Sequence, residues 1–162
     1  MNKRPRGGRG TNQYQVRGVT KASGPSVEVA SALQEAKEVE LRAAVDPECF
    51  SENQDVRLRL AEQGRLENLD FLVSDDFYKV RAAVADHGRP QNLDVLVSDD
   101  DDDVRITVAE QGRPEDLDVL VSDEQWSVRS AVAKHGRPQD LNVSVSDGHW
   151  TVRQSVAEHG RP

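Results

Sequence analysis

The sequence of 162 residues contains a single cysteine, Cys49. One cysteine cannot form an internal disulfide bond, and this scarcity is typical of proteins from a reducing compartment. No apolar run approaches the roughly 18 residues that a membrane-spanning helix needs. The N-terminal stretch MNKRPRGGRG has the positive charge of a signal peptide, but no apolar stretch follows it. We therefore predict a soluble, cytoplasmic protein without a transmembrane segment.

Charge is distributed unevenly along the chain. No acidic residue precedes Glu28, whereas the same segment carries Lys3, Arg4, Arg6, Arg9, Arg17 and Lys21. Without these six positive charges, the net charge of −8 becomes about −14. A body of that charge would be repelled by phosphate groups, so a nucleic acid could bind only at the N-terminal segment.

Residues 1–22 form this basic arm, and their glycine-rich, polar composition predicts disorder in the free protein. Two interpretations of the arm stay open. It is either a solubilising tail, or it becomes ordered on nucleic acid. In the second case its basic side chains would contact phosphates, and Tyr14 would stack on a base.

The sequence does contain a repeated phrase, VRxxVA, followed by glycine. Its period is 24 residues, with the Val–Arg pairs at Val56-Arg57, Val80-Arg81, Val104-Arg105, Val128-Arg129 and Val152-Arg153. The glycines keep the same period at Gly64, Gly88, Gly112, Gly136 and Gly160. A fixed period of roughly 20–50 residues indicates a solenoid, whose units bury their apolar faces against their neighbours.

Each repeat is predicted to contain two short helices. In the first helix, Val104 and Val108 lie one turn apart and form an apolar stripe. Gly112 ends this helix, and Arg113 suits the negative end of its dipole. Pro114 then begins the second helix, which is too short to be stable without packing. The expected N-cap residues of the first helices are Asp75, Asp99, Asp123 and Asp147.

The two ends of the array differ from its middle. Residues 26–45 are predicted to form one longer helix with Val29, Leu33 and Ala36 on one face, which would cap the N-terminal end. Near the other end, Ser144 takes the place of the leucine at position 120. The C-terminal end is therefore either weakly capped or a docking surface, and a homodimer could form through it. We predict a basic arm over 1–22, a capping helix with a truncated repeat over 23–55, and the solenoid over 56–162.

The pattern VRxxVAxHxxP, followed by LxxLxSD, resembles the leucine-rich repeat variant family, a relative of HEAT-type solenoids. The resemblance covers about residues 41–162. It implies an all-α, right-handed α-solenoid in which α-helices alternate with shorter, 3₁₀-like helices. One member with this pattern carries a four-cysteine iron–sulfur cluster. Cys49 stands alone here, so no such cofactor is carried over. A looser resemblance to HEAT-like DNA glycosylases covers only the architecture.

One column of residues varies between the constant positions. Two residues before each valine stand Gln54, Tyr78, Asp102, Trp126 and Trp150. Two positions correspond to a rotation of about 200° around a helix, so this column points away from the core-facing valine. Aromatic residues make up only 4% of the chain, yet both tryptophans and one of the two tyrosines stand here.

Two further rows follow this column on the same face. One contains Leu58, Ala82, Ile106, Ser130 and Gln154, and the other Glu62, Asp86, Glu110, Lys134 and Glu158. Aromatic anchors among polar residues are typical of protein interfaces. The alternative is that the tryptophans pack onto the neighbouring repeat. The predicted partner-binding residues are Tyr78, Asp102, Ile106, Trp126, Ser130, Lys134, His149, Trp150 and Gln154.

Charged and histidine side chains recur with the repeat. The arginine of each Val–Arg pair is expected to form an internal ladder with the recurring aspartates, in preference to cation–π pairs with the tryptophans. SDDDDDV at 98–104 suits a helix start or an acidic patch that meets a basic partner. It lacks the ligand spacing of a calcium loop. His87, His135 and His159 share one column with glutamines, which favours hydrogen bonding at a helix end.

No nucleophile–base pair, phosphate-binding loop or metal-ligand spacing is present in the sequence. An enzyme of the repeat-glycosylase kind would need an acid beside the tryptophans, for which Asp102 and Asp123 are the candidates. We therefore predict a non-enzymatic scaffold that binds a partner protein, without a cofactor or metal. The alternative is a protein that associates with nucleic acid through its basic arm.

Overall fold

Ten α-helices and one 3₁₀ turn make up residues 27–160, the part of the chain that the computed structural model describes, and this part contains no strand. The predicted basic arm over 1–22 lies outside the described residues. The chain divides after Ala36 into two units. Helix α1 (Val27–Ala44) confirms the long helix predicted over 26–45. None of the described helices is both long and apolar enough to cross a membrane.

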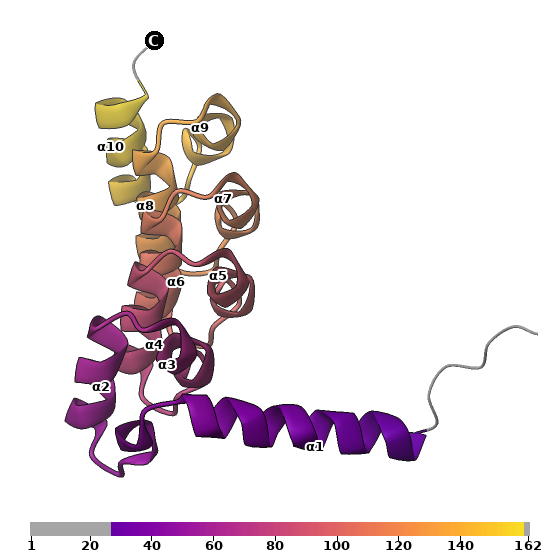
Figure 1. Cartoon of the computed structure of the whole chain (residues 1–162). Helices are drawn as coiled ribbons and strands as arrows, with labels where there is room; N and C mark the ends of the chain where they lie inside the picture. Colours follow the sequence, from indigo (N-terminus) through magenta and orange to yellow (C-terminus); the bar gives the residue numbers. More distant parts are fainter. Residues whose placement is uncertain (1–26, 161–162) are drawn as a thin grey trace, which may run out of the picture. The chain divides into compact units, whose positions relative to one another are not determined.

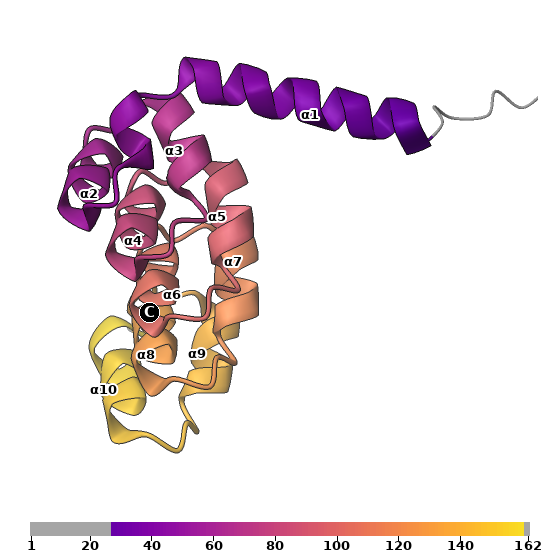
Figure 2. The ribbon, with the colours of Figure 1, turned by 90° about the horizontal axis from the view of Figure 1, so that it is seen from below.

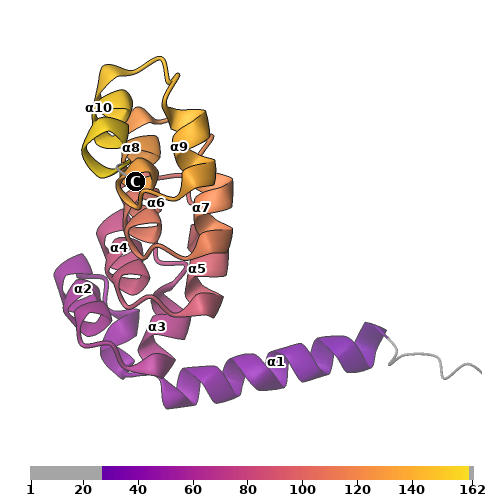
Figure 3. The same cartoon turned by 90° about the horizontal axis from the view of Figure 1, so that it is seen from above.

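Two kinds of helix alternate from residue 54 onward (Figure 1). The first helices of the repeats are α2 (Gln54–Glu62), α4 (Tyr78–Asp86), α6 (Asp102–Glu110), α8 (Trp126–Lys134) and α10 (Trp150–His159). The second helices are α3 (Leu66–Leu72), α5 (Pro90–Leu96), α7 (Pro114–Leu120) and α9 (Pro138–Ser144). Consecutive first helices pack on one another in one column, and the second helices lie along its side (Figure 2 and Figure 3). This arrangement confirms the predicted α-solenoid.

The second helices differ from the expected 3₁₀-like form, since each is an α-helix of seven residues. Helices α5, α7 and α9 begin with proline. The first residue of a helix donates no hydrogen bond within the helix, so the missing N–H of proline costs nothing at this position. Among the described residues, only η1 (Pro47–Phe50) is a 3₁₀ helix. It contacts α2 and α3 and contributes the buried Cys49.

The core consists of two recurring pairs of side chains. Helices α4, α6 and α8 each contribute two valines, such as Val104 and Val108, and α3, α5 and α7 each contribute two leucines, such as Leu117 and Leu120. The exposed fraction of these four side chains is 1% or less. Burying each contributes about 1.5–3 kcal/mol, and no repeat covers its own pairs. The stability of the array therefore arises at the interfaces between repeats.

An arginine in each of the first helices α2, α4, α6 and α8 joins two repeats. The Arg105 guanidinium donates to both carboxylate oxygens of Asp123 in the next repeat, at 2.7 and 3.0 Å. Its remaining nitrogen donates to the carbonyl of Asp99, at 2.8 Å. This confirms the predicted ladder, which we call the forward ladder. Its other members are Arg57–Asp75, Arg81–Asp99 and Arg129–Asp147.

The N-cap positions predicted for the ladder aspartates are wrong by two residues. The residues that precede the first helices are Asn53, Phe77, Asp101, Gln125 and His149. The carboxylate of Asp123 instead accepts the backbone N–H of Gln125, at 2.8 Å, and closes a turn. The helix begins only after this turn, because the same carboxylate must also face Arg105.

A second arginine ladder was not predicted from the sequence. Arg113, expected to complement a helix dipole, precedes α7 and pairs with Asp116 in its own helix at 2.6 Å. It also donates to Asp94 of α5, at 2.6 Å, and to the carbonyl of Pro90, at 3.2 Å. We call this set the backward ladder, because each arginine reaches the preceding repeat. Its other members are Arg89–Asp70 and Arg137–Asp118.

Glycine and histidine complete the ends of the first helices. Gly112 has a φ of +71°, which favours glycine at this position. The ring of His135 lies over it, and His135 Nε2 donates to the carbonyl of Ala109 at 2.7 Å. His87 makes the same bond to Ala61, at 2.8 Å. The expected hydrogen-bonding role of the histidine column is therefore confirmed at these two positions.

Substituting Gly112 tests this packing. A Cβ at Gly112 would lie 2.7 Å from Cε1 of His135 and would require a strained φ, so Gly112→Ala should destabilise the protein by about 1 kcal/mol or more. Gly148→Ala is the matched control, because a Cβ there meets nothing within 4 Å. Urea unfolding measures both variants. Equal losses of stability would contradict the packing.

Acid should unfold the protein through the forward ladder. Hydrogen bonds from Arg129 hold the pKa of Asp147 below its usual value, against the effect of burial. At Asp75 and Asp99 burial is the largest influence and raises the pKa. Hydrogen bonds from the arginine and from a backbone N–H, together with the arginine charge and a neighbouring aspartate, lower it by more, so the net direction is also downward. A lowered pKa stabilises the fold above the unfolded value of about 4, and this contribution is lost as the pH falls through the folded value.

Arg129→Gln should therefore cost about 3 kcal/mol at neutral pH and reduce the further loss of stability below about pH 4. Arg153→Gln is the matched control, since Arg153 occupies the same repeat position and pairs with no carboxylate among the described residues. Thermal unfolding at a series of pH values measures both. An unchanged acid dependence in Arg129→Gln would refute the assignment.

Candidate functional site

The two tryptophans lie on the surface of the array. Trp126 is 42% exposed and Trp150 is 63% exposed, whereas the valines two positions later are fully buried. Asp102 is half-buried and Gln154 is exposed. The tryptophan side chains thus point away from the core, as the rotation between the positions predicts.

A histidine lies between the two tryptophans. The ring of His149 stacks on Trp126 with centroids 4.3 Å apart and an angle of 12° between the planes. It also faces Trp150, with centroids 6.2 Å apart and an angle of 25°. The backbone N–H of His149 is fixed by Asp147 at 2.8 Å, so the forward ladder positions this ring. We call Trp126, His149 and Trp150 the aromatic stack.

A groove of about 380 Å³ runs beside the aromatic stack. We call it the tryptophan groove, and it is lined by Ile106, Trp126, Ser127, Ser130, Ala131, Lys134, Thr151, Gln154, Ser155 and Glu158. Helices α6, α8 and α10 all contribute to it, so a ligand in this groove would contact three consecutive repeats. Of the nine predicted partner-binding residues, it brings together Ile106, Trp126, Ser130, Lys134 and Gln154.

Ser130 was expected to face outward with its row, but its side chain is only 6% exposed. Its hydroxyl forms a hydrogen bond of 2.9 Å with that of Ser155 on the next first helix. This position of the row therefore lies between α8 and α10, because consecutive first helices pack closely. Ser130 and Ser155 form a polar floor of the groove, a feature that one helix considered alone could not reveal.

Tyr78 belongs to a different cluster. Its ring meets that of Phe77 edge to face, with centroids 5.4 Å apart, and Lys79 Nζ lies 5.9 Å from both ring centroids. Asp102 occupies the intervening repeat. The predicted column is thus divided into this half-buried pair and the aromatic stack.

The run of five aspartates divides into separate structural roles. Asp99 belongs to the forward ladder, and Asp100 pairs with Arg81 at 2.9 Å. Asp101 caps α6 by accepting the N–H of Asp103, at 3.0 Å. Asp102 accepts the hydroxyl of Ser127 at 3.3 Å, at the edge of the tryptophan groove. Within residues 27–160, no group of His, Cys, Asp and Glu side chains is arranged to hold a metal ion.

Cys49 is not a reactive thiol. Burial, together with the nearby charge of Asp46, raises its pKa to about 11. The thiolate is the nucleophilic and metal-binding form, so the buried Cys49 acts as a small apolar core residue.

The stacked pairs of short helices define a helical repeat protein of the solenoid class. The chain is similar to the solved structure of "a leucine-rich repeat variant with a novel repetitive protein structural motif", with a TM-score of 0.63 and 34% sequence identity. The similarity covers 75% of this chain and 50% of that chain, so the present chain spans about half the length of that structure. This similarity confirms the predicted resemblance to the leucine-rich repeat variant family. No family model and no curated protein matches it.

Proposed function

We propose that this chain is a non-enzymatic scaffold that binds a partner protein through the aromatic stack and the tryptophan groove. The observation that carries the proposal is the exposure of both tryptophans, at 42% and 63%, above a core that valines and leucines complete without them. Large exposed aromatic side chains next to a groove are typical of protein-binding hot spots.

The partner segment is proposed to be basic and to carry an apolar anchor. Outside the arm the chain has a net charge of about −14, the result of removing six positive charges from −8. The exposed carboxylate of Glu158 lines the groove, and that of Asp103 lies on α6, one of the three helices that form it. An arginine of the partner could stack on a tryptophan face, and a short apolar side chain could reach Ile106 in the lining of the groove.

The structural roles of the candidate acids support a non-enzymatic protein. Asp123 is bound by Arg105 in the forward ladder, and Asp102 accepts a hydrogen bond from Ser127. A buried, lone Cys49 supports a location in the reducing cytoplasm. The predicted homodimer through the C-terminal end concerns a different face, made by α9 and α10, and stays a prediction.

The double variant Trp126→Ala/Trp150→Ala tests the proposed surface. It should keep its unfolding temperature within a few degrees, because both side chains are exposed, and lose the partner recovered by affinity capture from host lysate after nuclease treatment. The matched control is Val119→Ala/Val143→Ala, which removes side chains of 56% and 54% exposure from the second helices. A partner retained by the tryptophan variant, or lost equally by the control, would refute the proposal.

A second candidate function rests on the basic arm, which lies outside the described residues. Its six cations before Glu28 contrast with the acidic remainder of the chain. Binding of single-stranded RNA or DNA should weaken steeply as salt rises and disappear on deletion of residues 1–22. Fluorescence anisotropy with a labelled oligonucleotide measures this. Binding that is insensitive to salt, or that survives the deletion, would exclude the arm.

A further inference from the structure

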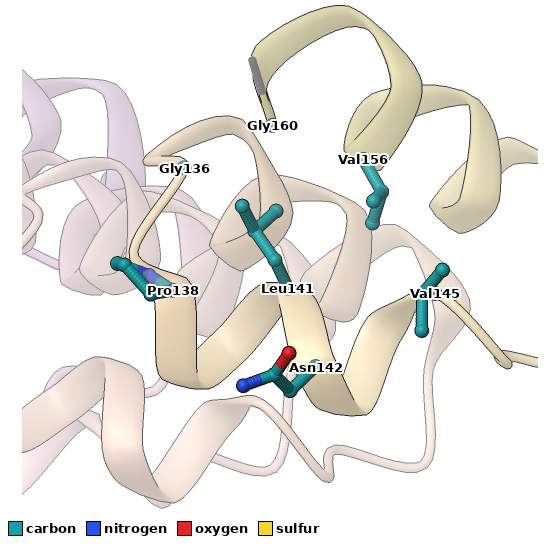
Figure 4. A pocket seen from close by; sticks show the side chains of 7 residues that line it. All are labelled: Gly136, Pro138, Leu141, Asn142, Val145, Val156 and Gly160. Carbon is teal, nitrogen blue, oxygen red and sulfur yellow. The ribbon is translucent and has the colours of Figure 1, made fainter. Parts of the chain in front are cut away.

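The second helices carry apolar side chains that the core does not use. Val95 and Val119 are 54% and 56% exposed, although each stands one residue before a leucine that is buried in the core. The corresponding residue of α3 is Phe71, which is half-buried. Figure 4 shows a second helix from close by, with Leu141 and Asn142 pointing to opposite sides of α9. The second helices therefore have an inner leucine face and an outer face, and Val95 and Val119 lie on the outer one.

Packing within the chain does not explain these two valines. An exposed β-branched residue inside a helix is less favourable than alanine, glutamate or lysine. Val95 and Val119 nevertheless occupy the same position of α5 and α7, two helices of only seven residues. Exposed apolar side chains that line up on a surface are typical of a face that another molecule covers.

A groove of about 470 Å³ lies next to Val119, between the turns that follow α5 and α7. Its apolar lining is formed by Val97, Val119 and Leu120. Helices α3 and α9 lie beyond it along the chain in either direction, so it belongs to the interior of the array. It shares no lining residue with the tryptophan groove, and an inference about it is therefore independent of the proposed function. We call it the acidic groove.

The charges of the acidic groove are not balanced. Four carboxylates line it, and they belong to Asp99, Asp100, Asp123 and Glu124. Arg81 holds Asp99 and Asp100, at 2.7 and 2.9 Å, and Arg105 holds Asp123, at 2.7 Å. The exposed carboxylate of Glu124 pairs with no cation among the described residues. Four carboxylates and two arginines leave a formal charge of −2 at the groove, which favours a positively charged ligand.

Exposed carboxylates recur beside the valines once in each repeat. Asp76, Asp100 and Glu124 follow one another at intervals of 24 residues, and all three are exposed. Packed helices lie roughly 8–10 Å apart. Three residues of a polyproline II segment span about 9 Å and complete one turn, so every third side chain lies on the same face. Cations at every third position of such a segment would therefore meet successive carboxylates of this row.

We propose that the outer face of the second helices binds an extended, basic segment of a partner protein, in which a cation and an apolar residue recur at every third position. The cations pair with Asp100 and Glu124, and the apolar side chains cover Val95 and Val119. A lysine stem would also pack against the apolar lining of the groove while its ammonium group stays in water. Phosphate groups are repelled here, and so is a second folded array, because outside its arm the chain carries about −14.

The experiment titrates the isotopically labelled full chain with the peptide (Lys-Val-Pro)₃, in which proline favours the extended conformation. Amide signals of Val97, Val119 and Glu124 should shift and saturate below a peptide concentration of about 1 mM at low salt. The peptide (Gln-Val-Pro)₃ should leave these signals in place. The peptide (Lys-Val-Pro-Pro)₃ has the same lysines and valines at every fourth position, so it should bind about fivefold more weakly.

Chain variants assign the contacts. Glu124→Gln should weaken binding of (Lys-Val-Pro)₃ about twofold to fivefold, and Val119→Ser should have an effect of similar size. Glu110→Gln removes an equally charged, exposed side chain from the end of α6 and should leave binding unchanged. Trp126→Ala/Trp150→Ala should also leave it unchanged, which separates this surface from the tryptophan groove.

Four outcomes would each overturn the proposal. They are the absence of saturation, equal binding of the two lysine peptides, equal effects of Glu124→Gln and Glu110→Gln, and loss of the peptide in the tryptophan variant. Binding that occurs only after deletion of residues 1–22 would assign the face to the basic arm of the chain itself and would also overturn it.

Discussion

The clamp between an arginine and the aspartate of the following repeat fixes the geometry of the whole array. One guanidinium binds the backbone of its own turn and the carboxylate of the next turn, so it sets the distance and the rotation between consecutive repeats. The same carboxylate holds the N–H of the residue that begins the next helix. Because His149 is such a residue, the clamp formed by Arg129 and Asp147 also determines where the aromatic stack forms. A contact that stabilises the fold thereby orients the candidate surface.

The constant and the variable positions of the repeat have different roles. Valines, leucines and the two ladders occupy the same places in nearly every copy, and they supply the burial and the ion pairs that hold neighbouring repeats together. The column of residues 54, 78, 102, 126 and 150 contributes less to this packing, since it changes from glutamine to tyrosine, aspartate and tryptophan while the repeats stack in the same way. A surface of this kind can acquire binding residues with little effect on stability.

The sequence predicted the features that depend on period alone. Helix pairs, positive-φ glycines and the forward ladder all follow from residues that recur every 24 positions. The features that it did not predict depend on contacts between neighbouring helices. Arg113 and Asp94 meet only because α5 and α7 lie side by side, and His149 stacks on Trp126 only because the turn before α10 brings its ring there. Ser130 is buried for the same reason, since its partner belongs to another helix.

The two ladders run in opposite directions along the chain. For this reason the array can gain or lose whole repeats more easily than single residues. The arginines of α2, α4, α6 and α8 reach 18 residues ahead, and the arginines that precede α5, α7 and α9 reach 19 residues back. Gaining or losing one whole repeat restores every pairing at the new junction, because each junction is chemically the same. A single residue inserted between Arg105 and Asp123 would instead break this ion pair of the forward ladder and displace every helix beyond it. The length of such an array can therefore change readily in steps of 24 residues, while changes of one or two residues are confined to places that no ladder spans.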